Sequence, residues 1–388
     1  MRATILALIL SASTATAQTC GGPVNSFIDG VKAEARAQGI PAQTIDAFFQ
    51  GAQIQQSVIN ADRAQGVFQR DFISFSRALI SQNRIDNGAT YGRRFDATFD
   101  TIEARFGIPR GVLLAFWAFE TDYGQVQGNF NTRDALLTLA HDCRRPDLFR
   151  PQLIAAIELF RRGGMDPART TGAWAGEIGQ LQKLPREIVR QGMDGDGDGV
   201  VDLKNSSPDA LMTGANVLSS LGWRANEPWL QEVTLPSNLD WSTTGLNHKA
   251  SVRDWARQGV TARTGSMGPA NLQASILLPM GRNGPAFIAY PNFEVYFDWN
   301  KSFVYVTTAA YFATRLGGAP VYNAGNPSPA LSGQEMEQLQ TKLTARGHDV
   351  GGIDGILGAM TRAAVQAEQV RLGLPADAWP TRALLNAL

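Results

Sequence analysis

The sequence predicts a mostly α-helical protein of the α+β class, with a small β-rich insert and a separate helical module at its C-terminus. Three observations support this prediction. Apolar residues recur every three or four positions from Val24 to Phe160. Short apolar runs alternate with glycine and proline turns from Gln231 to Phe297. A stretch rich in glycine and proline, Gly317 to Ser332, then precedes two further helical patterns.

The length and composition indicate a multidomain globular protein. The 388 residues suffice for two or three domains, and 44% of them are hydrophobic. The 35 basic and 35 acidic side chains cancel. Because the chain therefore has no net field to attract a polyanion, the composition disfavours nucleic-acid binding.

The N-terminus predicts export. Residues 1–17 contain Arg2, an apolar run from Ile5 to Leu10, and small residues before Gln18, which is typical of a signal peptide. The run is shorter than the ~20 residues needed to span a bilayer. Thr19 before Cys20 does not fit a lipoprotein cleavage site. We therefore expect a periplasmic protein without membrane insertion.

The chain has two cysteines, Cys20 and Cys143. An even count in an exported protein permits one disulfide, which would attach the mature N-terminus to the first domain. Two unpaired thiols are the alternative.

Punctuation by glycine and proline divides the chain. Gly39-Ile40-Pro41 and Gly107-Ile108-Pro109 each separate two expected helices, and a helical pattern resumes from Ser302 to Leu316. We therefore expect a first domain over 18–316, a flexible linker over 317–332 and a second domain over 333–388. Within the second domain, helical patterns run from Glu335 to Ala345 and from Met360 to Gln369.

One acidic residue ends a strongly apolar helical segment. Residues 111–119 are apolar on nearly every face, so the predicted helix is buried, and Glu120 follows directly. Apolar neighbours such as Phe116 and Trp117 penalise an ionised carboxylate. Glu120 is therefore a candidate general acid, because a general acid must hold its proton. The alternative is that Glu120 ends the helix in water.

The segment Phe119-Glu120-Thr121-Asp122-Tyr123-Gly124 resembles the Glu-Thr-x-Tyr/Phe-Gly signature of the membrane-bound lytic transglycosylase B family. Further blocks follow in that family's order and cover most of the first domain. They are 135–140, 172–176, 179–182, 194–203, 215–223 and 299–305. The resemblance implies a lysozyme-like catalytic domain.

In the family that this chain resembles, one carboxylate protonates the bond between N-acetylmuramic acid and N-acetylglucosamine and then acts as base. The C6 hydroxyl of the muramic residue attacks its own anomeric carbon and leaves a 1,6-anhydro end. The resemblance assigns this role to Glu120. A hydrolase that uses Asp122 or Glu177 as a second carboxylate remains an alternative, and so does an inactive wall-binding scaffold.

The same resemblance places four residues in a glycan-binding groove, where ordinary packing or capping is the alternative. They are Gln182, Trp299, Asn300 and Tyr305. The chain departs from the family's pattern at Ala173, Glu177, Lys183 and Val217, so its substrate contacts must differ.

An acidic loop predicts a structural Ca²⁺ site, whereas no cofactor is expected for catalysis. Asp194, Asp196 and Asp198 would be ligands 1, 3 and 5 of an EF-hand-like loop, and Val200 would offer its carbonyl at position 7. Position 12 is Asn205 instead of glutamate. The family's variant loop uses a later aspartate, which corresponds to Asp209. A solvated acidic turn is the alternative. His141, His248 and His348 do not have zinc-site spacing.

Residues 333–388 resemble the peptidoglycan-binding type 1 domain, through Leu339-Gln340, Ile353-Asp354-Gly355 and Leu372-Gly373-Leu374-Pro375. The resemblance implies a three-helix module that binds peptidoglycan strands. A tethered module raises the effective concentration of an enzyme on an insoluble polymer. Glu368 stands where that family has an apolar aromatic, so we expect altered packing of the last helix. No heptad pattern predicts an oligomer, and we expect a monomer.

Overall fold

The computed structural model describes residues 20–64 and 70–388, so the predicted signal peptide lies outside the described residues. Within these two ranges, none of the helices combines the length and apolarity that a membrane crossing requires. The chain is mostly helical, with small antiparallel sheets, as the sequence predicts.

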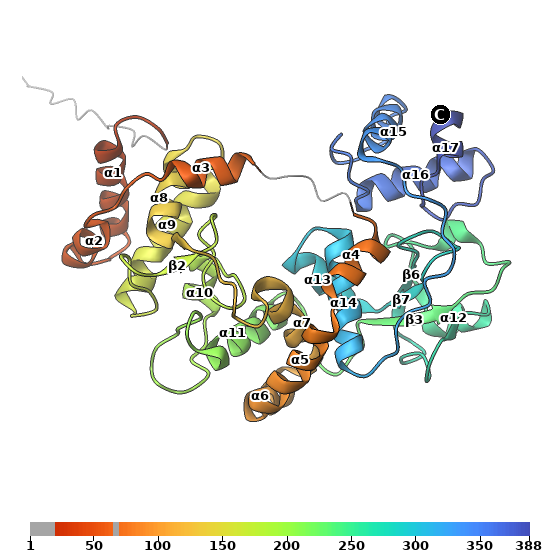
Figure 1. The fold of residues 1–388 in the computed structure, drawn as a ribbon, viewed down its shortest axis with the longest axis horizontal. Coiled ribbons are helices and arrows are strands. Elements are labelled where there is room, and N and C mark those ends of the chain that lie inside the picture. The colour runs from red at the N-terminus through yellow and green to blue at the C-terminus, as the bar shows by residue number, and fades with distance from the viewer. Residues whose placement is uncertain (1–19, 65–69) are drawn as a thin grey trace, which may run out of the picture.

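Six helices and a two-stranded sheet form an N-terminal lobe (Figure 1). Apolar residues such as Phe27, Leu136 and Ile157 form its core. A disulfide joins Cys20 to Cys143, with 5.2 Å between their Cα atoms, and so holds the start of the chain to this lobe. The elements are α1 (Val24–Ala37), α2 (Ala42–Phe49), α3 (Gln56–Arg63), α8 (Thr132–His141), α9 (Pro146–Arg161), α10 (Pro185–Gln191), β1 (Phe130–Asn131) and β2 (Thr171–Gly172).

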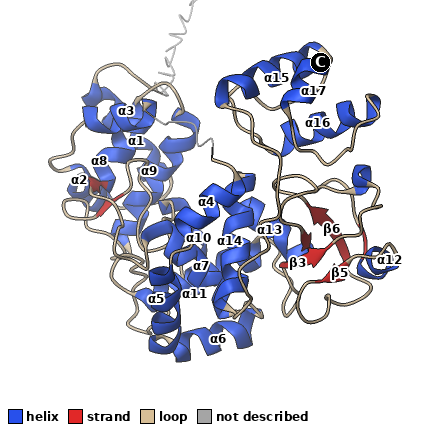
Figure 2. Ribbon diagram, turned by 45° about the vertical axis from the view of Figure 1, so that its right-hand side comes forward, coloured by secondary structure: helices blue, strands red, loops and turns tan. Residues whose placement is uncertain are grey.

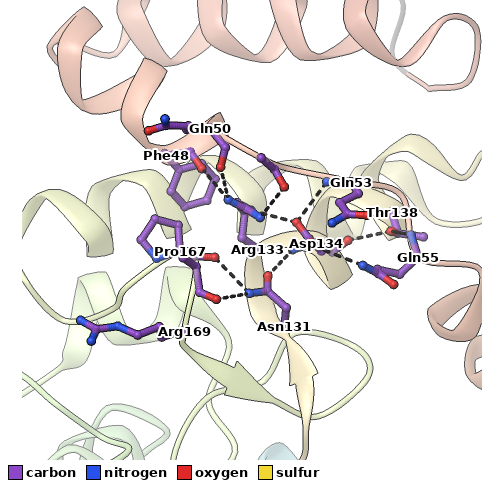
Figure 3. A network of polar contacts seen from close by, with 12 residues as sticks. Phe48, Gln50, Gln53, Gln55, Asn131, Arg133, Asp134, Thr138, Pro167 and Arg169 are labelled. Atoms are coloured by element: carbon purple, nitrogen blue, oxygen red, sulfur yellow. Dashed lines mark hydrogen bonds and ion pairs between the residues drawn. The ribbon is translucent and has the colours of Figure 1, made fainter.

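A buried ion pair on α8 fixes the segment between α2 and α3 (Figure 3). Arg133 donates to the carbonyl oxygens of Gln50 at 2.7 Å and Gly51 at 3.0 Å. Its partner Asp134 accepts from the backbone N–H of Gln53 at 3.2 Å. Because each charged group meets backbone partners as well as its counter-ion, the cost of burying the pair is offset.

A second group of helices surrounds α7 (Arg110–Thr121), which is buried on nearly every side as predicted. The backbone of α7 lies close to α14 (Phe303–Leu316), because a Cβ on Gly111 would stand 2.8 Å from the carbonyl oxygen of Ala313. The other members are α4 (Phe72–Leu79), α5 (Gln82–Arg94), α6 (Asp96–Phe106), α11 (Ser207–Ser220) and α13 (Pro291–Trp299). This packing positions the end of α7 beside the start of α14.

The predicted β-rich insert is a five-stranded antiparallel sheet with strand order β4-β6-β7-β3-β5. Figure 2 shows β3, β5 and β6 of this sheet, with α12 beside them. Ile276 of β6 pairs with Ile288 of β7, and both side chains pack in a core that also contains Trp255. The elements are β3 (Leu230–Thr234), β4 (Ala250–Ser251), β5 (Thr261–Ala262), β6 (Gln273–Leu277), β7 (Phe287–Ala289), α12 (Val252–Arg257) and a 3₁₀ turn at Trp241–Thr243.

The C-terminal module has three helices, α15 (Gly333–Ala345), α16 (Ala359–Arg371) and α17 (Arg382–Ala387). Ser332 and Glu335 form a capping box that begins α15. Glu368 is buried in α16 and meets His348 Nε2 at 2.8 Å and Arg371 at 2.7 Å. The hydrogen bond from Arg371 lowers the pKa of Glu368. The module therefore accommodates this unexpected acidic residue by ion pairing.

The segment between α14 and α15 has no helix or strand, as expected for a linker, and it contacts both the central helices and the C-terminal module. Tyr322 is buried against the central helices, and its hydroxyl lies 2.9 Å from Ser76 Oγ. Trp379 Nε1 of the module donates to the carbonyl of Ser328 at 3.0 Å. In this structure the segment therefore packs against the central helices at Tyr322 and against the module at Ser328.

Candidate active site

The turn after α7 fixes the direction of Glu120. Asp122 and Gly124 have left-handed φ values of 51° and 85°, which end the helix directly after Thr121. The buried Thr121 hydroxyl donates to the carbonyl of Gln180 at 2.6 Å and accepts from the N–H of Gly124 at 2.9 Å. Glu120 thus lies in the last turn of a helix whose end is hydrogen-bonded both to Gln180 and to the following turn.

Two donors from a distant part of the chain converge on one oxygen of Glu120. Trp299 Nε1 donates to Glu120 Oε1 at 3.0 Å, and the Tyr305 hydroxyl donates to the same oxygen at 2.6 Å. Burial, followed by the Glu120 charge, raises the pKa of Tyr305 well above its ordinary value. The hydroxyl therefore keeps its proton and remains a donor. Glu120 itself is partly exposed.

Aromatic packing holds the indole in place. The Phe116 ring stacks on Trp299 with centroids 4.3 Å apart and an interplanar angle of 25°. Phe116 also stacks on Tyr296, with centroids 4.9 Å apart. Such offset stacks add to the free energy gained from burial alone. The indole that contacts Glu120 is therefore partly buried and packs against the core around α7.

Other charged groups lie near Glu120. The Lys183 ammonium is 3.1 Å from the Trp299 ring centroid and 3.2 Å from Glu187 Oε1. Burial lowers the pKa of Lys183 and raises that of Glu177. Glu177 Oε2 has no hydrogen-bond partner among the described residues. The sequence marked Lys183 only as a departure from a family pattern and Glu177 also as a candidate second carboxylate, but nothing local in the sequence reveals that they lie near Trp299 and Glu120.

Asp122, one of the two candidate second carboxylates, forms an ion pair with Arg84 of α5. Arg84 Nε donates to Asp122 Oδ1 at 3.0 Å. This ion pair engages Oδ1 of Asp122 on the side of α5, so of the two candidates only Glu177 has a buried oxygen without a hydrogen-bond partner among the described residues.

The two predicted amide ligands make local contacts. Gln182 has a φ of 50°, and its side-chain amide donates to the carbonyl of Gly179 at 2.8 Å. Asn300 Oδ1 accepts from the N–H of Ser302 at 2.8 Å in the turn between α13 and α14. Among the hydrogen bonds of the described residues, neither side chain reaches Glu120. Asn300 and Tyr305 border a cavity of about 900 Å³ that the C-terminal module closes on its other side.

The acidic loop brings three of its predicted ligands together. Carboxylate oxygens of Asp194, Asp196 and Asp209 lie within 4.8 Å of one another. Asp198 is not a member of this group, since its Oδ1 accepts from the N–H of Val200 at 2.8 Å. Asp209 is in the first turn of α11, so the helix start completes the loop.

Two family models match the chain. The model for the transglycosylase SLT domain matches residues 23–314. The model described as a putative peptidoglycan binding domain matches residues 332–388.

Named relatives agree with these matches. Membrane-bound lytic murein transglycosylase B of Escherichia coli is 25% identical over 235 residues, 60% of this chain and 63% of the relative, so the match spans less than two thirds of that relative's length. SltB3 of Pseudomonas aeruginosa, solved in complex with NAG-anhNAM-pentapeptide, is 35% identical with a TM-score of 0.86, over 95% of this chain and 99% of that chain. Slt35 of Escherichia coli, solved in complex with calcium, is 23% identical with a TM-score of 0.64, over 80% and 98% of the two chains, and shows a shared fold.

Proposed function

This chain belongs to the transglycosylase SLT domain family, and from that membership we propose that it is a lytic transglycosylase that cleaves the glycan strands of peptidoglycan. The observation that carries the proposal is the convergence of Trp299 and Tyr305 on one oxygen of Glu120. We propose cleavage between N-acetylmuramic acid and N-acetylglucosamine, with a 1,6-anhydro product.

The geometry suits a carboxyl group that first gives and then takes a proton. Both donors occupy Oε1, and among the described residues no hydrogen bond engages Oε2 of Glu120. A proton on Oε2 can therefore pass to the glycosidic oxygen. As the bond breaks, charge develops on the carboxylate, and the two fixed donors stabilise that charge.

The second step uses Glu120 as a base. The carboxylate accepts the proton of the muramic C6 hydroxyl while that oxygen bonds to the anomeric carbon. Because the substrate supplies its own nucleophile, neither a second carboxylate nor an activated water is required, unlike in paired-carboxylate glycosidases. In this proposal Gln182 and Asn300 hold acetamido groups of the glycan once local contacts such as the bond from Gln182 to Gly179 are exchanged for substrate.

Digestion of purified peptidoglycan sacculi tests the proposal. Mass spectrometry should find anhydro-ended fragments with the wild type and with Glu294→Gln, a control on the exposed face of α13. Glu120→Gln should reduce their release by at least about 100-fold, since it removes the acid and the base. Fragments with reducing ends would instead identify a hydrolase, with Glu177 as the second carboxylate. No fragments from the wild type would identify a scaffold.

We also propose that the acidic loop binds a structural Ca²⁺. Asp194, Asp196 and Asp209 supply hard oxygen donors at a mutual spacing that ligand distances of about 2.3–2.6 Å allow. The ion would join the loop to the start of α11. Added Ca²⁺ should raise the melting temperature of the wild type and of Asp298→Asn, an exposed aspartate outside the loop, but not of Asp194→Asn. An unchanged wild-type melting temperature would exclude the site.

The remaining parts of the proposal concern place and partners. We propose export to the periplasm through the N-terminal segment, binding of peptidoglycan strands by residues 332–388, and a monomeric state. Cell fractionation, sedimentation with sacculi and light scattering test these three points separately.

A further inference from the structure

A buried ammonium group lies on the face of the indole that contacts Glu120. The Lys183 side chain is only 7% exposed, and its Nζ is 3.1 Å from the Trp299 ring centroid. Phe116 stacks on the same indole with centroids 4.3 Å apart. Two groups at these distances cannot share one face, so the indole is held between the Phe116 ring and the Lys183 cation.

The backbone and the neighbouring helix fix this lysine. Its N–H and carbonyl both pair with Ile178, at 3.0 and 2.8 Å. Two residues later Pro185 begins α10, and Glu187 in the first turn of that helix lies 3.2 Å from the ammonium. The position of Nζ over the ring is therefore set by a short bridge on one side and an ion pair on the other.

The environment of Lys183 is costly unless the charge has partners. Burial lowers the pKa of Lys183, whereas the negative charges of Glu187 and Glu120 both favour its protonated form. Tryptophan is the aromatic side chain that attracts a cation most strongly, and the attraction is larger when the pair is out of water. A side chain that only filled space would avoid this desolvation cost.

We propose that Lys183 is a positioning residue for Glu120: its ammonium, held by Glu187, clamps the Trp299 indole so that the indole N–H donates to the carboxyl. This inference rests on the proposed function of Glu120. The cation also withdraws electron density from the indole and so makes its N–H a stronger donor. The residues act as a chain, from Glu187 through Lys183 and Trp299 to Glu120.

Three variants separate this role from simple packing. Lys183→Met keeps much of the side-chain volume and removes the charge, Lys183→Arg keeps a cation, and Glu187→Gln removes the ion-pair partner. Lys183→Met should lower kcat for anhydro-fragment release about tenfold with KM within about twofold. Lys183→Arg should recover most of this loss. Glu187→Gln should give an intermediate kcat, and Glu294→Gln serves as the control.

A spectroscopic measurement gives a readout that does not depend on activity. The indole N–H resonance of Trp299, assigned by its loss in Trp299→Phe, should shift in ¹⁵N-labelled Lys183→Met and stay near the wild-type position in Lys183→Arg. Wild-type kcat and an unmoved indole resonance in Lys183→Met would overturn the inference. If Lys183→Met does not fold, unchanged kcat and indole resonance in Glu187→Gln would overturn it.

The two proposals fail in distinguishable ways. A wild-type protein that releases no fragments, but whose Trp299 resonance responds to Lys183→Met, would refute the proposed function and leave the clamp standing. If the wild type releases anhydro fragments, and Lys183→Met shows the wild-type kcat and an unmoved Trp299 resonance, the clamp alone would be refuted.

Discussion

Tyr305→Phe removes one hydrogen bond from Glu120 and little else. The Tyr305 hydroxyl donates to Glu120 Oε1 at 2.6 Å, and its ring meets Phe119 edge-on at 6.0 Å, a contact that phenylalanine preserves. A hydrogen bond to a charged group contributes about 1.5–3 kcal/mol. In the proposed mechanism the carboxyl gives its proton to the glycosidic oxygen and becomes charged as the bond breaks, so most of this loss falls on the transition state. We expect kcat to fall about 10- to 150-fold.

The assay follows soluble anhydro fragments released from sacculi over time, at several substrate loadings. KM should stay within about twofold, because the lost interaction strengthens only in the transition state. Tyr296→Phe is the matched control on the preceding helix. The Tyr296 ring stacks on Phe116, but its buried hydroxyl has no hydrogen-bond partner among the described residues. Its removal should leave kcat unchanged.

Three results would refute this reasoning. A folded Tyr305→Phe variant with wild-type kcat would mean that the hydroxyl does not stabilise the developing carboxylate. Equal losses in Tyr305→Phe and Tyr296→Phe would mean that the effect comes from aromatic packing. A rise in KM with unchanged kcat would mean that the Tyr305 hydroxyl contributes to glycan binding and not to stabilising the Glu120 carboxylate.

Three further predictions concern stability. Arg362 donates to backbone carbonyls of the insert and lies 4.4 Å from the centroid of the Phe303 ring. Arg362→Met should therefore weaken docking of the module by about 1–3 kcal/mol and speed proteolysis within residues 317–332. An unchanged cleavage rate would contradict this prediction. Cys20→Ser opens a link between positions 123 residues apart and should cost about 2–5 kcal/mol of stability in urea unfolding, unless the bond is absent in solution. Arg161 and Arg162 lower the pKa of Glu158 from 4.5 to about 2, so its stabilisation is present above the unfolded pKa and is lost as pH falls from about 4.5 towards 2. This pKa shift corresponds to at most about 3 kcal/mol of folding stability, and solvent screening reduces it to about 1 kcal/mol because the arginines are half exposed. Glu158→Gln should therefore lower the melting temperature at pH 7 but not near pH 2.

Local patterns were sufficient to predict most of the fold. The apolar run before Glu120 predicted the buried helix α7, and alternation of short apolar runs with turns predicted the sheet that contains Ile276 and Ile288. Such periodicities depend on neighbours in sequence, so they survive without knowledge of tertiary contacts. The three-helix module followed from a family resemblance, and the structure and the matching family model agree with it.

The arrangement of the candidate active site could not be predicted from local patterns in the same way. Trp299 and Tyr305 stand 179 and 185 residues after Glu120, and the packing of α7 against both α13 and α14 brings them to one oxygen. Resemblance named both residues, but no pattern in the sequence indicates that they contact Glu120. The acidic loop shows a similar limit. Alternating aspartates predicted Asp194, Asp196 and Asp198 as ligands, and only the family resemblance added Asp209. The fold places the start of α11, and therefore Asp209, beside Asp194 and Asp196, and leaves Asp198 outside this group.

The segment 317–332 shows that composition alone does not reveal the tertiary contacts of a linker. Glycine and proline correctly predicted the lack of helix and strand, because they disfavour regular structure. Whether such a segment moves depends on the surface beneath it, and here Tyr322 enters the central core while Trp379 of the module donates to Ser328. A flexible tether raises local concentration without fixing direction. The module lines the same cavity of about 900 Å³ as Asn300 and Tyr305. Under the proposed function, a strand bound by the module would therefore lie beside Tyr305, which donates to Glu120.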